Sequence, residues 1–279
     1  MPYVRTPEVS LYYEVLGDGP PLCLISGYRQ SSAAWPRQFV ARLASRYQTI
    51  IFDNRGTGRS DKPQGSYEFD HQTGDVVGLL DHLGMPKVHL LGFSMGGAIA
   101  QEVVIRHAER VDRLILFGTF CGGVWAEPAS WSVLRQLFVT EGLSPEQAAR
   151  QAWPVTYSPD YLAANADAIE HQMRRELAYP TPAFVAQEQM QALRRFDRYR
   201  DLPRIRAATL VATGADDLLV KPRNSVILAS RIPNARLELL ADLGHRAIWE
   251  APEEMADLIG DFLSRPGATA AQARVRQLV

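Results

Sequence analysis

One short segment of the sequence has the residue spacing that nucleophilic catalysis requires. Residues 92–96 read Gly-Phe-Ser-Met-Gly, follow an apolar run over 87–92 and precede a helical pattern over 95–107. A sharp turn between a strand and a helix would present the hydroxyl of Ser94, and only glycines fit on either side of it. We therefore predict that Ser94 is a nucleophile. The alternative is a glycine-rich turn around a buried serine.

A serine needs a base to accept its proton, and His245 is the best-placed candidate. It ends the segment 242–245, Asp-Leu-Gly-His, between the last predicted strand and the last predicted helix. A loop in that position lies at the carboxyl edge of a parallel sheet, on the same side as Ser94. The other histidines are more simply explained as surface or packing residues: His71, His82, His89, His107 and His171.

Two adjacent aspartates are placed to orient the imidazole of His245. The predicted strand over 209–213 ends at Gly214, and Asp216 and Asp217 follow it at the same edge of the sheet. An acid behind the histidine fixes the orientation of the ring and stabilises its positive charge. From their position alone either aspartate could serve, and the other would be a solvated loop residue.

Two backbone N–H groups are candidates for an oxyanion hole. Met95 begins the helix after Ser94, so its N–H and the positive end of the helix dipole face the serine. Residues 26–29, Ser-Gly-Tyr-Arg, follow another predicted strand, and Gly27 allows a bend that turns the N–H of Tyr28 inward. An ordinary turn is the alternative for this loop.

The elements around these residues alternate between strands and helices. This order predicts an α/β fold with a mostly parallel central sheet flanked by helices, and several strands are apolar throughout, as in sheets covered on both faces. We expect an early antiparallel strand over 11–16. The other predicted strands cover 21–26, 49–53, 87–92, 113–117, 209–213 and 236–240, and the predicted helices cover 70–83, 95–107 and 252–263.

The alternation stops between residues 122 and 203, where helical patterns are interrupted by prolines. We expect this segment to be a helical lid over the Ser94 pocket, inserted into a core formed by 1–121 and 204–279. Residues 266–279 are small and polar and are expected to form a frayed tail. Four lid aromatics are candidates for lining the substrate pocket, although they could equally form the core of the lid: Trp125, Trp131, Phe138 and Trp153.

The composition excludes several classes of function. The chain has 279 residues with 30 Lys and Arg against 31 Asp and Glu, so bulk charge attracts neither nucleic acid nor anionic membranes. A basic run over 194–206 is interrupted by Asp197 and Asp201, which is typical of a solvated helix face. No apolar run approaches the ~20 residues that span a bilayer, and no signal core is present. We expect a cytoplasmic protein that binds a small molecule, as a monomer or a homodimer.

No metal or other cofactor is expected. The histidines and cysteines lack the spacing of metal ligands, and no dinucleotide-binding glycine motif follows a strand. Cys23 and Cys121 end strand-like apolar runs and are expected to be buried, reduced thiols, because two cysteines cannot form a disulfide framework.

From about residue 12 to residue 263 the chain resembles the α/β-hydrolase superfamily. The matching segments are 25–28, 52–60, 92–96, 214–217, and 244–245 together with 250–253. Together they are specific for the superfamily, but they say much less about the substrate. The chain departs from many relatives in having Ser-Gly instead of His-Gly at the oxyanion loop, and a phenylalanine before the nucleophile. The Ser-Gly form is similar to that of aminoacrylate hydrolases and enol-lactonases.

The resemblance implies the order serine, acid, histidine along the chain, which places Asp53 too early to be the acid. In relatives the acid usually stands three residues after the glycine that ends the strand, which selects Asp217. Asp53 and Arg55 are then interpreted as structural residues that tie down the loop over 54–60.

The resemblance further implies a serine hydrolase without metal. Such an enzyme would cleave an ester, lactone, thioester or related carbonyl of a small, apolar or aromatic molecule through an acyl-enzyme. The alternatives are carbon–carbon bond hydrolysis, perhydrolysis or lyase or cyclase chemistry at the same site, and a slow ligand-binding receptor.

Overall fold

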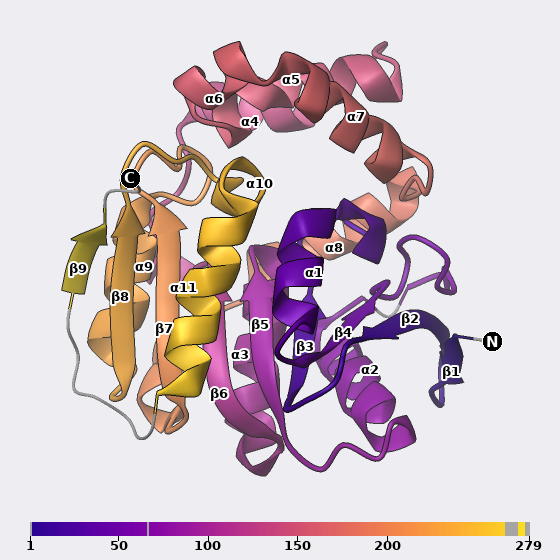
Figure 1. Cartoon of the computed structure of the whole chain (residues 1–279). Helices are drawn as coiled ribbons and strands as arrows, with labels where there is room; N and C mark the ends of the chain where they lie inside the picture. The colour runs from indigo at the N-terminus through magenta and orange to yellow at the C-terminus, as the bar shows by residue number, and fades with distance from the viewer. Residues whose placement is uncertain (1, 66, 266–272, 277–279) are drawn as a thin grey trace.

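The computed structural model describes residues 2–65, 67–265 and 273–276, which build a sheet covered by helices on both faces (Figure 1). The strand order is β1-β2-β4-β3-β5-β6-β7-β8-β9. The strands are β1 (Tyr3–Arg5), β2 (Ser10–Leu16), β3 (Pro21–Ile25), β4 (Gln48–Phe52), β5 (Val88–Phe93), β6 (Val111–Phe117), β7 (Ala208–Gly214), β8 (Ala235–Leu240) and β9 (Ala273–Arg276). The β1–β2 and β2–β4 pairs are antiparallel and the other pairs are parallel, which confirms the predicted fold class.

Helices connect the parallel strands, so the carboxyl ends of these strands meet at one edge of the sheet. The α-helices are α1 (Arg37–Ala44), α2 (Phe69–His82), α3 (Met95–Arg106), α4 (Trp131–Phe138), α5 (Pro145–Thr156), α6 (Pro159–Ala164), α7 (Ala166–Leu177), α8 (Ala183–Arg195), α9 (Pro222–Arg231), α10 (Ala247–Glu250) and α11 (Pro252–Ser264). Each predicted strand and helix coincides with an observed one to within two residues at either end. Among the described residues, no helix is both long enough and apolar enough to cross a membrane.

The sheet separates two apolar cores. One core packs α2, α3 and α9 against one face, and the other packs α1 and α11 against the opposite face. Side chains alternate between the faces along each strand, so Leu90 of β5 enters the first core and Leu91 the second. Burial on both faces explains why β5 is apolar throughout, apart from His89.

Both cysteines lie in this apolar interior as free thiols. Cys23 belongs to β3, and Cys121 follows β6. Burial raises the pKa of the Cys23 thiol to about 12 and that of Cys121 to about 11. Because the thiolate is the reactive form, these two side chains behave as small apolar groups.

The expectation of a frayed tail is wrong for residues 273–276. They form β9, which pairs in parallel with β8 from Leu237 to Leu240. Without β9 the outer backbone groups of β8 would lie unpaired at the edge of the sheet. Residues 273–276 pair with these groups and extend the sheet by one strand. The remainder of the predicted tail, 266–272 and 277–279, lies outside the described residues.

The chain between β6 and β7 is mostly helical. Helices α4 to α7 lie beyond the carboxyl edge of the sheet, and α8 leads back toward it (Figure 1). Two of the prolines that interrupt the sequence pattern begin helices, because Pro145 and Pro159 each occupy the first helical position after a serine cap. The role of this helical segment as a lid over Ser94 stays a prediction.

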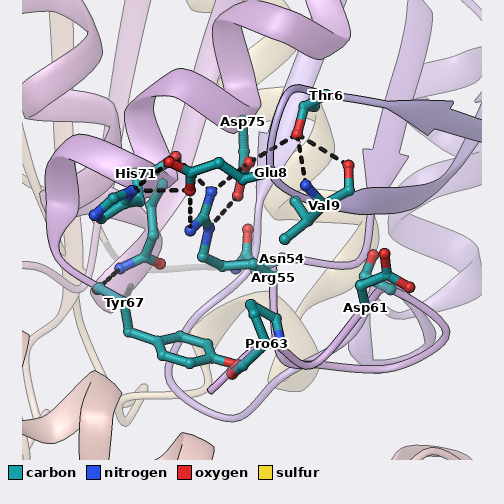
Figure 2. Close-up of polar contacts among 12 residues, drawn as sticks. Thr6, Glu8, Val9, Asn54, Arg55, Asp61, Pro63, Tyr67, His71 and Asp75 are labelled. Atoms are coloured by element: carbon teal, nitrogen blue, oxygen red, sulfur yellow. Dashed lines mark hydrogen bonds and ion pairs between the residues drawn. The ribbon is translucent and has the colours of Figure 1, made fainter. Parts of the chain in front are cut away.

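Arg55 joins the N-terminal segment to α2 through a buried ion pair (Figure 2). Its guanidinium lies 2.6 Å from Asp75 and 3.0 Å from Glu8, and both Arg55 and Asp75 are buried. Glu8 in turn lies 2.9 Å from His71. Arg55 is therefore structural, as expected, but these ion-pair partners differ from the partners of Asp53.

Asp53 has separate partners in the loop that follows it. Its fully buried carboxylate accepts hydrogen bonds from the backbone and hydroxyl of Ser32 and from the backbone of Arg59. Asp53 thus ties the loop over 54–60 to the segment that precedes α1.

We expect Arg55→Met to lower the free energy of unfolding by about 3–5 kcal/mol, because it leaves the Asp75 carboxylate buried without a cation. Urea unfolding followed by circular dichroism measures this loss. Arg42→Met is the matched control, since Arg42 pairs with Asp257 at the surface, where both side chains are about half exposed. Equal unfolding midpoints for the two variants would contradict the assignment.

Candidate active site

Ser94 occupies a tight turn between β5 and α3. Its backbone has φ 54° and ψ −119°, a region that non-glycine residues rarely adopt. Two hydrogen bonds, one with the last residue of β6 and one with the chain after β6, fix the turn. The N–H of Ser94 donates to the carbonyl of Phe117 at 2.9 Å, and the hydroxyl of Thr119 donates to the carbonyl of Ser94 at 2.7 Å. Thr119 is a contributor that the sequence did not reveal.

The glycines around Ser94 permit close backbone contacts. A Cβ atom on Gly92 would lie 2.3 Å from the carbonyl oxygen of Gly96, and one on Gly96 would lie 2.1 Å from that of Ile25. One on Gly97 would lie 2.5 Å from the side chain of Thr119. Real Cβ atoms cannot approach so closely, so α3 can begin beside β3 only without side chains at these positions.

His245 and Asp217 form a buried pair at the carboxyl edge of the sheet. Nδ1 of His245 lies 2.7 Å from Oδ2 of Asp217, and the two residues are 5% and 2% exposed. The other oxygen of Asp217 accepts the N–H groups of Leu219 and Val220 at 2.9 and 2.7 Å. Asp216 is exposed, and the structure places Asp217 rather than Asp216 against the imidazole.

The imidazole of His245 lies beside the chain segments that hold Ser94. Its centroid is 5.0 Å from the ring of Phe93, the residue before the serine. A Cβ atom on Gly118 would lie 3.4 Å from the imidazole, and Gly118 directly follows the residue that accepts the Ser94 N–H. The fold thus places the His245–Asp217 pair beside Phe93 and Gly118, next to the turn that carries Ser94.

The loop after β3 approaches the serine from the other side. A Cβ atom on Gly27 would lie 3.3 Å from Cβ of Ser94. The side chain of Gln30 accepts the Gly27 N–H at 3.1 Å, whereas the N–H of Tyr28 has no acceptor among the described residues. Met95 is the first residue of α3, where no intrahelical acceptor exists. Both predicted oxyanion donors therefore have an N–H to offer.

The four predicted pocket aromatics separate into two groups. Phe138 packs edge-on against Tyr28, with ring centroids 6.0 Å apart, and Trp153 packs against the buried cluster that includes Phe93. Trp125 instead stacks on Tyr199 with centroids 4.3 Å apart, and Trp131 is 73% exposed. Of the four, only Phe138 has a ring contact with a residue of the predicted site within the described chain.

Glu250 is a buried carboxylate whose role the sequence did not reveal. It accepts the N–H of Gly244 at 3.0 Å and that of Ser158 at 3.2 Å, so it connects the His245 loop to the start of α6. Burial raises its pKa above the usual range. Glu250 lies in a segment that carries the family resemblance, but its partners are backbone groups that only the fold brings near.

Ser94 lies in a turn between a strand and a helix, and a histidine–aspartate pair lies beside this turn. This geometry agrees with a comparison of the sequence with protein-family profiles. The profile of the alpha/beta hydrolase family matches residues 24–258, well over half of the chain. The chain belongs to the alpha/beta hydrolase family. The described residues of this hydrolase contain no group of three or more His, Cys, Asp or Glu side chains that could hold a metal ion.

Curated relatives and solved structures agree with this assignment. The hydrolase is 30% identical over 237 residues to a putative carbamate hydrolase RutD of Azorhizobium caulinodans, covering 85% of this chain and 88% of the relative. It is 30% identical over 261 residues to 3-oxoadipate enol-lactonase 2 of Acinetobacter baylyi, covering 92% and 94%.

Two crystal structures show the same architecture. The enol-lactonase from Burkholderia xenovorans LB400 superposes with a TM-score of 0.81 at 26% identity, covering 95% of this hydrolase and 100% of that chain. Esterase RhEst1 from Rhodococcus sp. superposes with a TM-score of 0.82 at 26% identity, covering 95% and 98%.

We expect Gly96→Ala to lower the free energy of unfolding by about 1–3 kcal/mol and to abolish turnover in this hydrolase, because the new methyl group collides with the backbone of β3. Gly74→Ala is the control within α2, where nothing lies within 4 Å of the added Cβ atom. It should stabilise the protein by about 0.5–1 kcal/mol. Thermal unfolding of both variants tests this, and a harmless Gly96→Ala would contradict the described turn.

Proposed function

We propose that this hydrolase cleaves an ester, lactone, thioester or related carbonyl of a small molecule through an acyl-enzyme on Ser94. The observation that carries the proposal is the buried 2.7 Å contact between His245 and Asp217 beside a serine held at positive φ. A carboxylate at Nδ1 keeps the proton on that nitrogen, which leaves Nε2 to accept the proton of a serine hydroxyl.

In the first half-reaction, Oγ of Ser94 attacks the carbonyl carbon as His245 removes the hydroxyl proton. The carbonyl oxygen becomes an oxyanion that the N–H groups of Tyr28 and Met95 stabilise, with the positive end of α3 behind it. The carbon–heteroatom bond then breaks, His245 gives its proton to the departing oxygen, sulfur or nitrogen, and Ser94 carries the acyl group.

In the second half-reaction, His245 takes a proton from water, and the hydroxide formed attacks the acyl carbon. The same oxyanion site receives the charge, and Ser94 leaves with the proton from His245. Asp217 stabilises the imidazolium in both halves and is itself oriented by the N–H groups of Leu219 and Val220. The residues present are sufficient for this cycle.

The relatives support a carbonyl substrate with a heteroatom leaving group. Their names, carbamate hydrolase, enol-lactonase and esterase, all describe the loss of oxygen or nitrogen from a carbonyl carbon. The helical segment between β6 and β7 acts in this proposal as a lid, and Phe138 and Trp153 supply the apolar wall that favours an apolar or aromatic substituent.

The serine is tested with p-nitrophenyl esters of short acids in stopped flow. We expect a burst of one nitrophenolate per active site, and complete loss of the burst after treatment with a fluorophosphonate. Ser94→Ala should keep the fold and lower turnover by about 10⁶-fold, whereas Ser230→Ala, an exposed serine, should behave as wild type. Normal turnover by Ser94→Ala would overturn the proposal.

The acid is tested by two matched substitutions of adjacent residues. Asp217→Asn should lower kcat by about 10⁴-fold, because the amide no longer holds the imidazole in the required tautomer. Asp216→Asn should leave kcat within about twofold, since Asp216 is exposed and solvated. Steady-state kinetics on the same ester measures both values, and the reverse pattern would move the role to Asp216.

A further inference from the structure

Helix α8 and the turn before it hold the oxyanion loop through three hydrogen bonds. The phenol of Tyr28 donates to the carbonyl of Ala186 at 3.1 Å, and the N–H of Arg29 donates to the side-chain oxygen of Gln189 at 3.0 Å. The hydroxyl of Thr181 donates to the carbonyl of Arg29 at 2.9 Å. The N–H and the carbonyl of Arg29 are thus both held by a segment some 150 residues away in sequence.

Gln189 is unusual among these partners because it is completely buried. It is 0% exposed, and its Nε2 has no hydrogen-bond partner among the described residues, although Oε1 is used. A buried donor without an acceptor destabilises the folded state, whereas an apolar side chain of similar shape would not. The stabilisation of the fold therefore does not explain an amide at this position, and the bond to Arg29 does.

Arg29 needs that bond because of its backbone conformation. It has φ 61°, one of few positive values for a non-glycine residue in the described chain. Such a conformation persists only where neighbouring groups enforce it. The amide of Gln189 fixes the peptide between Tyr28 and Arg29, while the turn from Gly27 to Gln30 fixes the peptide on the other side of Tyr28.

We propose that Gln189 is a positioning residue that sets the direction of the Tyr28 N–H in the oxyanion hole. The inference rests on the proposed function, since it requires that an oxyanion forms at Ser94. It makes α8 a structural determinant of turnover without any contact between Gln189 and the substrate. An oxyanion donor that points about 1 Å away from its target weakens the transition state far more than the ground state.

The test compares Gln189→Met with Gln187→Met, an exposed position on the same helix. Gln189→Met keeps the shape and removes the acceptor for Arg29. We expect kcat on p-nitrophenyl esters to fall by about 10- to 100-fold with KM within about twofold. The inhibition constant of a trifluoromethyl ketone, which forms a tetrahedral oxyanion on serine, should rise by the same factor as kcat falls. Gln187→Met should change none of these.

A structural role alone would lower the melting temperature of Gln189→Met without raising the inhibition constant of the ketone, and that result would overturn the inference. If Gln189→Met does not fold, Thr181→Val removes the bond to the Arg29 carbonyl from a less buried position. It should change kcat and the inhibition constant in the same direction by a smaller factor, and unchanged values would overturn the inference too. Wild-type enzyme that fails to react with a fluorophosphonate would instead overturn the proposed function.

Discussion

The backbone of Ser94 is bent to φ 54° and ψ −119° where β5 ends and α3 begins, and the rest of the site is arranged around this bend. The bend is possible because Gly92 and Gly96 carry no side chain, so the first turn of α3 can approach the carbonyl of Ile25 in β3. The same approach brings the loop after β3 against Ser94. A strained residue of this kind persists only where its surroundings leave no other arrangement, and the hydrogen bonds to Phe117 and Thr119 provide that constraint.

A glycine at the end of β7 and another in the loop after β8 let these loops reach the same place. A Cβ atom on Gly214, at the end of β7, would lie 2.1 Å from the carbonyl oxygen of Leu243 in the loop that follows β8. One on Gly244 would lie 2.8 Å from the backbone of Tyr157, at the end of α5. These close contacts place the Asp217 carboxylate within hydrogen-bond distance of His245 and connect both loops to the helical segment above them. The helical segment is therefore joined to the histidine loop as well as to the oxyanion loop.

Much of this arrangement was predictable from the sequence because its signals are local. Apolar runs bounded by glycine or proline predict the main strands and place Ser94, His245 and the adjacent pair Asp216 and Asp217 at one edge of the sheet, and the family resemblance selects Asp217. Gln189 and Glu250 were not predictable, because each acts on backbone N–H groups that only the folded chain brings near. No local pattern distinguishes a glutamine that faces a loop from one that faces water.

Other differences between the expectations and the structure have equally specific causes. Residues 273–276 have the composition of a tail, and only the open edge of β8 gives them a partner. The sequence offers Trp131 as a candidate for the pocket or for the core of the lid, and in α4 its position faces solvent. The ring of Trp125 packs on the ring of Tyr199. Composition alone cannot separate an aromatic residue that lines a pocket from one that packs elsewhere on the same helices.

The most direct test of this account is a crystal structure of the enzyme after reaction with an alkyl fluorophosphonate, which mimics the tetrahedral intermediate. The account predicts a phosphorus atom bonded to Oγ of Ser94, with its unesterified oxygen about 2.7–3.1 Å from the backbone nitrogens of both Tyr28 and Met95. A phosphonyl group on another residue would contradict the account, and so would an oxygen that points away from these two nitrogens.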